Sequence, residues 1–423
     1  MKHNKKIVFL LILLLISLPI SKGINSNNHK NLLEKNCKEE KLNLLRVEHY
    51  LEITADNDTD EFNVYYAFPP IYRYQVPIFL QVFNDSTDDI LNYKIENDTQ
   101  KPNKLVNFTI KDIKKDEHKL IHFTVWVLVK NISFNDMPKC RDYPIKENLS
   151  NETKKWLTKT SVVQTDNVFI KLKSRQIEFF NKDMISYTKR VSEYIKDHRY
   201  LLFVLQLNLG IFFSQDAVTT LFLGGENVGR GHLACALLRN QNIPSRIVLV
   251  NNDQGFWTQM HYMVEYYVPE YGWVLIDTTE GKTPYDTGRQ IINRICYPED
   301  ENETKTDYIF KFMKGEERWI WIDNSNVKPY YVNCKEGSKS QMFIEKKIKI
   351  CDTLVDGSLV KTSKTFMLYQ EFLGKNLTGQ NKIFFENGVL FQKNAIHSMK
   401  NGDMLEYYYD IRRAGEEYQK INI

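Results

Sequence analysis

The sequence predicts an α+β protein in which a core of helices and strands lies between two strand-rich regions. A helical segment followed directly by three strand-like runs occupies residues 224–277. Short runs rich in β-branched and aromatic residues precede this segment at 38–140 and follow it at 341–410. The chain has 423 residues and is 42% hydrophobic, which is enough for two or three packed domains.

The first 23 residues have the pattern of a secretory signal peptide. Lys2, Lys5 and Lys6 form a basic start, residues 7–20 are apolar apart from Ser17 and Pro19, and residues 21–23 form a cleavage region. We therefore expect a secreted or cell-surface protein. An uncleaved segment that anchors the chain in a membrane is the alternative, although the run is short for a spanning helix.

Export would permit disulfides and N-glycosylation. Six cysteines are present, and we expect the pairs Cys37–Cys140 and Cys296–Cys334. Nine sequons occur, most of them before the core, and glycans on them would mark exposed positions. These sequons begin at Asn57, Asn84, Asn97, Asn107, Asn131, Asn148, Asn151, Asn302 and Asn376.

The region 38–140 is typical of a β-sandwich. Strand-like runs occupy residues 44–54, 62–68, 77–83, 105–111 and 120–129, with turn residues between them. We find no repeat and no catalytic set of residues there. Its expected role is spacing or binding.

The core, which we place at residues 150–335, begins with helices. Helical segments are expected at 151–157, 167–180 and 182–196, and another begins at Asp216. Gly224 and Gly225 interrupt the chain before a helix that continues to about residue 240 and stops before Pro244. Strands are expected at 246–250, 261–268 and 273–277, the last two joined by the turn 269–272.

Four short motifs within this core occur in a specific order. They are LLR at 237–239, NIPSR at 242–246, HYMVEYY at 261–267 and GWVLIDTT at 272–279. In this order and spacing the chain resembles the core of the transglutaminase-like superfamily, which is related to papain-type cysteine proteases. The resemblance covers roughly residues 150–335 and is strongest over 217–280. It implies a transglutaminase-like, papain-like fold.

The resemblance also implies a catalytic triad, of which this chain keeps two members. The family's nucleophilic cysteine lies twelve residues before the arginine of LLR, and that position is Asn227, after Gly225 and Glu226. The family's histidine and aspartate correspond to His261 and Asp277. An amide cannot replace a thiolate as a nucleophile. The nearest cysteine, Cys235, would lie ~12 Å further along the helix and is expected to be a buried residue facing the sheet.

The spacing of His261 and Asp277 requires a particular hairpin. Side chains alternate between the faces of a strand, so the two residues share a face only if the connecting loop has an odd length. A three-residue loop, 269–271, would place Met263 opposite Asp277. His261 would then be a diagonal neighbour of Asp277 at ~7–8 Å between Cα atoms, close enough for an imidazole–carboxylate interaction.

The segments after the core also suggest strands. A strand pair is expected at 307–313 and 318–323, with Trp319 and Trp321 stacking on the sheet edge or, alternatively, on a ligand. After a linker at 335–340, we expect strands at 342–351, 365–372, 382–385, 389–392 and 404–409. Asn387-Gly388 is typical of a tight hairpin. We therefore expect a small β-rich domain over 341–423.

Composition narrows the possible functions. The net charge is only +4, and the lysines are interspersed with acids, so no nucleic-acid-binding surface is expected. We find no zinc-ligand spacing and no dense carboxylate loop for calcium, so neither a metal nor an organic cofactor is indicated.

Three functions remain open. The first is an exported protein, inactive as a thiol enzyme, that binds a peptide or protein or acts as a cell-surface scaffold. The second is an active peptidase, amidase or protein-glutamine acyltransferase that uses a non-cysteine mechanism around His261 and Asp277. The third is a surface structural protein. Of these we predict the first.

Overall fold

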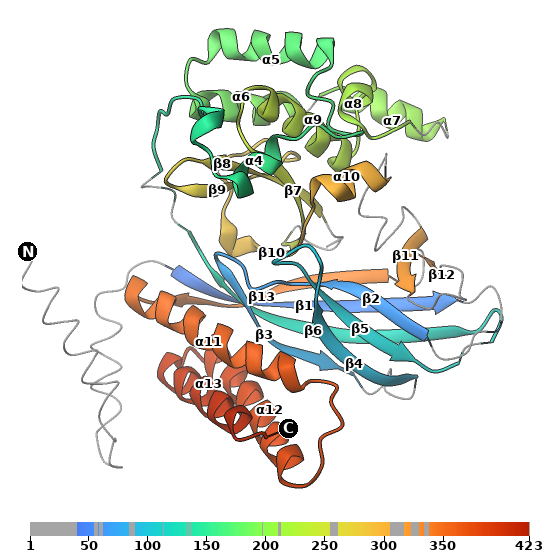
Figure 1. The fold of residues 1–423 in the computed structure, drawn as a ribbon, viewed down its shortest axis with the longest axis vertical. Helices are drawn as coiled ribbons and strands as arrows, with labels where there is room; N and C mark the ends of the chain where they lie inside the picture. The colour runs from blue at the N-terminus through green and yellow to red at the C-terminus, as the bar shows by residue number, and fades with distance from the viewer. Residues whose placement is uncertain are drawn as a thin grey trace, which may run out of the picture.

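The computed structural model describes residues 40–422, except 55–57, 59–61, 84–88, 113, 133, 135–136, 197, 210–212, 254–260, 305–316, 323–329 and 334–337. The molecule is elongated, with three parts stacked along its long axis (Figure 1). Helices and a small sheet form one end, a large sheet lies in the middle, and a group of C-terminal helices forms the other end. The expected α+β class is confirmed.

The large sheet contains nine strands in the described part of the chain. They are β1 (Glu40–Thr54), β2 (Phe62–Phe68), β3 (Gln75–Val82), β4 (Ile90–Asn97), β5 (Lys104–Ile110), β6 (His118–Lys130), β11 (Glu317–Ile322), β12 (Tyr330–Asn333) and β13 (Ser338–Lys349). Their order is β3-β6-β1-β12-β11-β2-β5-β4, and β13 also pairs with β1. The five strands expected between residues 44 and 129 are all present, whereas β4 was not predicted.

The two halves of this sheet pack against each other face to face. Phe108 on β5 and Tyr66 on β2 contact Phe123 on β6, with ring centroids 5.2 Å and 5.7 Å away. Neither β5 nor β2 is hydrogen-bonded to β6, so these contacts cross the interior. The arrangement is sandwich-like, as expected for this region.

The core has helices on one side of a four-stranded antiparallel sheet. The helical elements are α4 (Asn151–Lys154), α5 (Val168–Phe180), α6 (Met184–Lys196), α7 (Tyr200–Asn208), α8 (Ala217–Leu223) and α9 (Asn227–Asn240). The sheet has the order β10-β7-β8-β9, formed by β10 (Gln290–Ile295), β7 (Ser245–Asn252), β8 (His261–Val268) and β9 (Gly272–Ile276). Helix α10 (Pro298–Thr304) follows. The expected helices and strands of 151–277 are confirmed, whereas β10 was not predicted.

The expected C-terminal β-rich domain is wrong beyond its first strand. After β13 the chain forms three helices, α11 (Asp352–Phe372), α12 (Gly379–Lys400) and α13 (Met404–Gln419). The runs at 365–372, 382–385, 389–392 and 404–409 are helical because they pack against one another and against the large sheet. The contact between Phe68 and Phe366, with centroids 5.9 Å apart, is one example.

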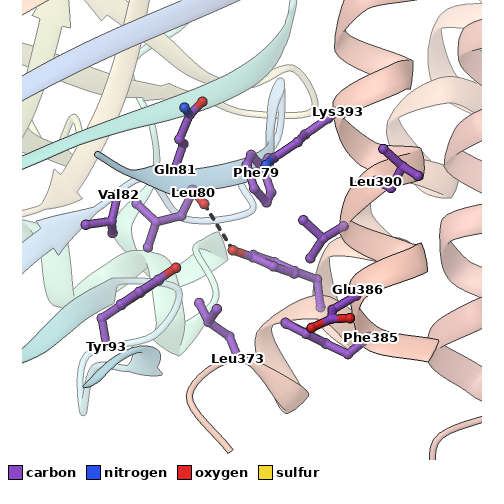
Figure 2. A pocket seen from close by; sticks show the side chains of 12 residues that line it. Phe79, Leu80, Gln81, Val82, Tyr93, Leu373, Phe385, Glu386, Leu390 and Lys393 are labelled. Carbon is purple, nitrogen blue, oxygen red and sulfur yellow. Dashed lines mark hydrogen bonds between the residues drawn. The ribbon is translucent and has the colours of Figure 1, made fainter. Parts of the chain in front are cut away.

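These helices cover the strands at the two ends of the sheet order, β3 and β4. The hydroxyl of Tyr369 donates to the carbonyl of Leu80 at 3.2 Å, and Gln392 donates to Ile78 O at 2.8 Å. Gln370 on α11 reaches Ile95 O on β4 at 3.2 Å. Figure 2 shows the aromatic and aliphatic side chains between β3, β4 and the helices, with the Tyr369 bond dashed. The helices therefore satisfy edge carbonyls that would otherwise face water.

The structure also tests the expected disulfide pairs and the expected exposure of the sequons. Neither Cys140 nor Cys296 forms a disulfide, so the pairs Cys37–Cys140 and Cys296–Cys334 are wrong. Asn107 is buried on β5, so its sequon does not mark an exposed position. The sequon asparagines at 97, 148, 151, 302 and 376 are exposed.

Other expectations lie outside the described residues. They are the signal segment 1–23, Cys37, Cys334, the sequons at Asn57 and Asn84, the strand at 307–313, the first part of the linker at 335–340, and the side chains of Trp319 and Trp321.

Candidate functional site

A tight turn between two helices positions Asn227. Gly224 ends α8 with φ of +80°, and a Cβ there would lie 2.6 Å from the carbonyl oxygen of Arg199. A Cβ on Gly225 would approach Thr220 Oγ1 to 2.8 Å. Glycine is therefore required at Gly224 by both conformation and space. Asn227 follows as the first residue of α9, with its side chain half-buried at the helix N-terminus.

The hairpin of β8 and β9 positions His261 and Asp277. Val268 pairs with Gly272, so the loop has three residues, and the pairing continues to Val264 opposite Ile276. This is the odd loop and the register that the sequence predicted. Continued by one residue, the same register places Met263 opposite Asp277 and His261 diagonally across from it.

The structure brings Asn227, His261 and Asp277 together. Asn227 Nδ2 lies 3.0 Å from His261 Nδ1, and His261 Nε2 lies 3.5 Å from Asp277 Oδ1. Thr279 Oγ1 donates to Asn227 Oδ1 at 2.8 Å. The side chains of His261 and Asp277 are buried, whereas Asn227 and Thr279 are half-buried. Ligands can therefore approach the site from the asparagine end.

The hydrogen-bonding chemistry assigns the tautomer of His261. An amide nitrogen can only donate, so Nδ1 accepts from Asn227, and the ring proton is carried by Nε2, which faces Asp277. In a thiol enzyme with this geometry, Nδ1 would be the atom that takes the thiol proton. Here the lone pair of Nδ1 is engaged by a group that holds no acidic proton.

The carboxylate of Asp277 is held in its ionised form. Burial raises its pKa, but the interaction with His261 and the backbone N–H groups of Glu280 and Thr279 outweighs burial, so the pKa is lowered. Those N–H groups donate to Oδ1 at 3.0 Å and 2.8 Å. Asp277 can therefore orient the imidazole, as an aspartate does in a triad.

Cys235 cannot substitute for the missing thiol. It is fully buried on α9, and burial raises its pKa to about 12, so it stays a thiol near neutral pH. Its backbone carbonyl accepts from Ser245 Oγ on β7 at 3.4 Å. Its expected position in the core, facing the sheet, is confirmed.

Other motif residues support the sheet and do not contact Asn227. Arg246 donates to Glu265 at 2.9 Å and stacks on Trp273, with the guanidinium 3.8 Å from the ring centroid. Arg239, the arginine of LLR, forms a buried ion pair with Glu301 on α10 at 2.7 Å. Arg246 therefore links β7 to β8, and Arg239 links α9 to α10.

Sequence reasoning missed three residues near the site. Thr279 follows Asp277 in the GWVLIDTT motif, so its position next to Asn227 could have been expected from the hairpin register. Val250 on β7 is paired with His261, and Asn252 lies two residues further along β7, so Asn252 is on the same face of the sheet as His261. Gln290 is paired with Asn252 and therefore shares that face. Gln290 lies on the unpredicted strand β10. Its amide atoms and Asn252 Nδ2 are buried and have no hydrogen-bond partner among the described residues.

The described residues contain no group of three or more His, Cys, Asp or Glu side chains that could hold a metal ion. A hollow of about 360 Å³ lies elsewhere, between β3, β4, α11 and α12, and is lined by Phe79, Tyr93, Phe385 and Lys393 among others (Figure 2). None of its lining residues belongs to the site at Asn227.

One family model matches part of this chain. Residues 176–278 match the family model described as the transglutaminase-like superfamily, a range that includes Asn227, His261 and Asp277. One similar solved structure is titled a "putative cysteine protease" from Cytophaga hutchinsonii. It has 12% identity and a TM-score of 0.48, covering 71% of this chain and 98% of that one.

A second similar structure is titled a "putative protease" from Parabacteroides distasonis. It has 12% identity and a TM-score of 0.24, with coverage of 59% of this chain and 47% of that one. A search of curated proteins finds no match.

Proposed function

We propose that this protein, which carries a transglutaminase-like core over residues 176–278, is a non-catalytic member of that fold that binds a peptide or protein segment. The half-buried Asn227 end of the site, with His261 and Asp277 behind it, would hold the ligand without covalent chemistry. The apolar run after Lys2, Lys5 and Lys6 supports export, so we place this binding outside the cell or at its surface.

One observation carries the proposal: Asn227 Nδ2 lies 3.0 Å from His261 Nδ1. The asparagine occupies the nucleophile position and also engages the lone pair that would act as a general base. An active water-based mechanism would need that lone pair to be free. Thr279 fixes the other end of the amide at 2.8 Å, which holds Asn227 in this orientation.

The chemistry of the site favours an amide-containing ligand. A primary amide offers both donors and an acceptor, so Asn227 can pair with a peptide bond or a side-chain amide once Thr279 or His261 shifts. Peptides supply both hydrogen-bonding partners that such groups need.

The proposal is tested with the purified protein on casein. We expect the wild-type protein neither to hydrolyse casein nor to incorporate a labelled amine into it. It should bind casein peptides saturably, and Asn227→Ala should weaken that binding about tenfold through the loss of a positioned hydrogen-bonding group. The matched control is Asn376→Ala, which removes an exposed amide outside the core and should leave binding unchanged.

Two results would contradict the proposal. Wild-type activity that is lost in His261→Ala would show that the site is catalytic through another nucleophile. Absence of both activity and saturable peptide binding would leave a surface structural protein as the better explanation.

A further inference from the structure

The exposed apolar side chains of this protein are concentrated before the candidate site. Among the described residues, seventeen large hydrophobic side chains are exposed, and ten of them lie between Val168 and Phe222. Single exposed apolar residues are ordinary, but a concentration of them marks an interaction surface.

Helix α5 carries the most distinct part of this concentration. Its buried residues are Ile170, Ser174 and Ile177, which recur at helical spacing. The opposite side, which we call the α5 outer face, carries Val168, Phe169, Leu172, Phe179 and Phe180, with exposed fractions of 58%, 48%, 57%, 68% and 77%. This helix therefore has apolar side chains on the side that points away from the protein.

The outer face continues onto a neighbouring helix. Phe169 makes an edge-to-face contact with Phe222 of α8, with centroids 4.9 Å apart, and Phe222 is itself 41% exposed. Helix α7 adds a second stripe at helical spacing, formed by Leu201 and Leu205 and extended by Leu209 just after it.

The charges on and just after α5 are almost all positive. Lys171, Arg175 and Lys182 are exposed and have no ion-pair partner among the described residues, and Lys182 lies 5.3 Å from the ring centroid of Phe179. The acid of this segment, Glu178, is half-buried and accepts from Gln241 at 3.0 Å, so it is turned toward the protein. A surface that combines aromatic side chains with unpaired cations is complementary to anionic lipid headgroups above an apolar layer.

The position of α5 suits contact with a flat surface. It lies at one extreme of the long axis, on the side of the molecule opposite the C-terminal helices (Figure 1). No helix in the described part of the chain is long and apolar enough to cross a membrane. We propose that the α5 outer face attaches this protein peripherally to an anionic membrane surface, with Phe179 and Phe180 inserting and Lys171, Arg175 and Lys182 contacting headgroups.

Vesicle sedimentation tests this proposal. The wild-type protein should bind vesicles of mixed phosphatidylcholine and phosphatidylglycerol more tightly than vesicles of phosphatidylcholine alone, and added salt should reduce the difference. Phe179→Ser with Phe180→Ser should weaken binding to the mixed vesicles about tenfold or more, because two large apolar side chains are lost from the contact. Lys171→Glu with Arg175→Glu should abolish the preference for the anionic lipid.

The matched control is the double substitution Val360→Ser with Met367→Ser. These two side chains lie on α11, at the other end of the molecule, and are 55% and 58% exposed. It should bind as the wild type does, and thermal melting confirms that each variant is folded. Equal binding by the Phe179/Phe180 variant and the wild type would overturn the proposal, as would absence of vesicle binding. Self-association that this variant abolishes, without vesicle binding, would assign the face to contact between copies.

Discussion

At the scale of single residues, the site has a carboxamide at Asn227, where the family resemblance places a thiol. Asn227 stands at a helix N-terminus, where a thiolate would be stabilised by the helix dipole. His261 Nε2 and Asp277 Oδ1 lie 3.5 Å apart, which is longer than a well-formed hydrogen bond. The three side chains therefore lie together, and the one at the helix N-terminus is an amide.

The sequence allowed all three of these residues to be named, because motif spacing and strand alternation are local rules. It could not show that the amide of Asn227 bonds to both His261 and Thr279, since that depends on side-chain rotamers. It also could not show the buried amide of Gln290, which has no hydrogen-bond partner in the part of the chain that the structure describes, because β10 lacks a clear alternating pattern.

The ionisation of Asp277 should make part of the stability depend on pH. Its folded pKa is lowered, so its contribution is fully present above the unfolded value of about 3.9 and is lost as pH falls through the folded value. We expect Asp277→Asn to lower the free energy of unfolding at pH 7 by about 1.5–3 kcal/mol, the range for hydrogen bonds to charged groups. Urea unfolding of both proteins at several pH values measures this.

The difference between wild type and Asp277→Asn should shrink as pH falls below about 4, where the carboxyl of the unfolded state becomes protonated first, and should be lost below the lowered folded pKa. Asp112→Asn, which alters an exposed carboxylate, should behave as the wild type throughout. A difference that stays constant from neutral to acid pH would show that Asp277 is not held ionised by its partners.

At the scale of elements, the sequence was sufficient where β-branched and aromatic residues form a short run bounded by turn residues. The pattern gave β2 at 62–68 and β8 at 261–268 with the bounds that the structure has. It failed in α11, α12 and α13, although the buried residues of α12 and α13 recur at helical spacing on one side. In α12, the aromatic and β-branched residues at 382–392 were interpreted as two strands, and Asn387-Gly388 as the turn between them.

Gly388 shows the physical reason for that error. A Cβ at this position would lie 2.3 Å from the ring of Tyr418, which is fully buried on α13. The glycine therefore permits a close approach of two helices, and no turn is formed. Sequence alone does not distinguish these two uses of glycine.

Two alanine substitutions separate the uses of glycine in these helices. Gly388→Ala should destabilise the protein by about 1–3 kcal/mol through overpacking, despite the higher helix propensity of alanine. Gly357 lies on α11, and a Cβ added there would have nothing within 4 Å, so Gly357→Ala should stabilise by about 0.5–1 kcal/mol. Thermal unfolding gives both values, and a stabilising Gly388→Ala would contradict the close packing of α12 and α13.

At the scale of the whole molecule, buried polar side chains join the core to the large sheet. Gln75 donates to Ile292 O at 2.7 Å, and Asn103 donates to Ile295 O at 2.8 Å. Arg294 on β10 pairs with Asp98 at the end of β4 and with Asp300 at 3.1 Å. The partners on the two sheets are far apart in sequence, so no local pattern could have predicted them.

Removing one of these charges should weaken the whole protein. Asp98→Asn leaves Arg294, which is only 3% exposed, with fewer anionic partners, and we expect a loss of about 1.5–3 kcal/mol in the free energy of unfolding. Glu152→Gln, in an exposed ion pair with Lys155, should leave the urea midpoint unchanged. Equal midpoints for Asp98→Asn and wild type would show that this pair does not contribute to joining the two sheets.

The most direct test of the central claim, that the site lacks only its nucleophile, is the thiol pKa of Asn227→Cys. It is measured from the rate of alkylation by iodoacetamide against pH, with Cys140→Ser in the background to remove the exposed thiol. We expect the new thiol to titrate well below its ordinary value of about 8.5 and to return toward that value when His261→Ala is added. A thiol that titrates at its ordinary pKa whether or not His261 is present would contradict the claim.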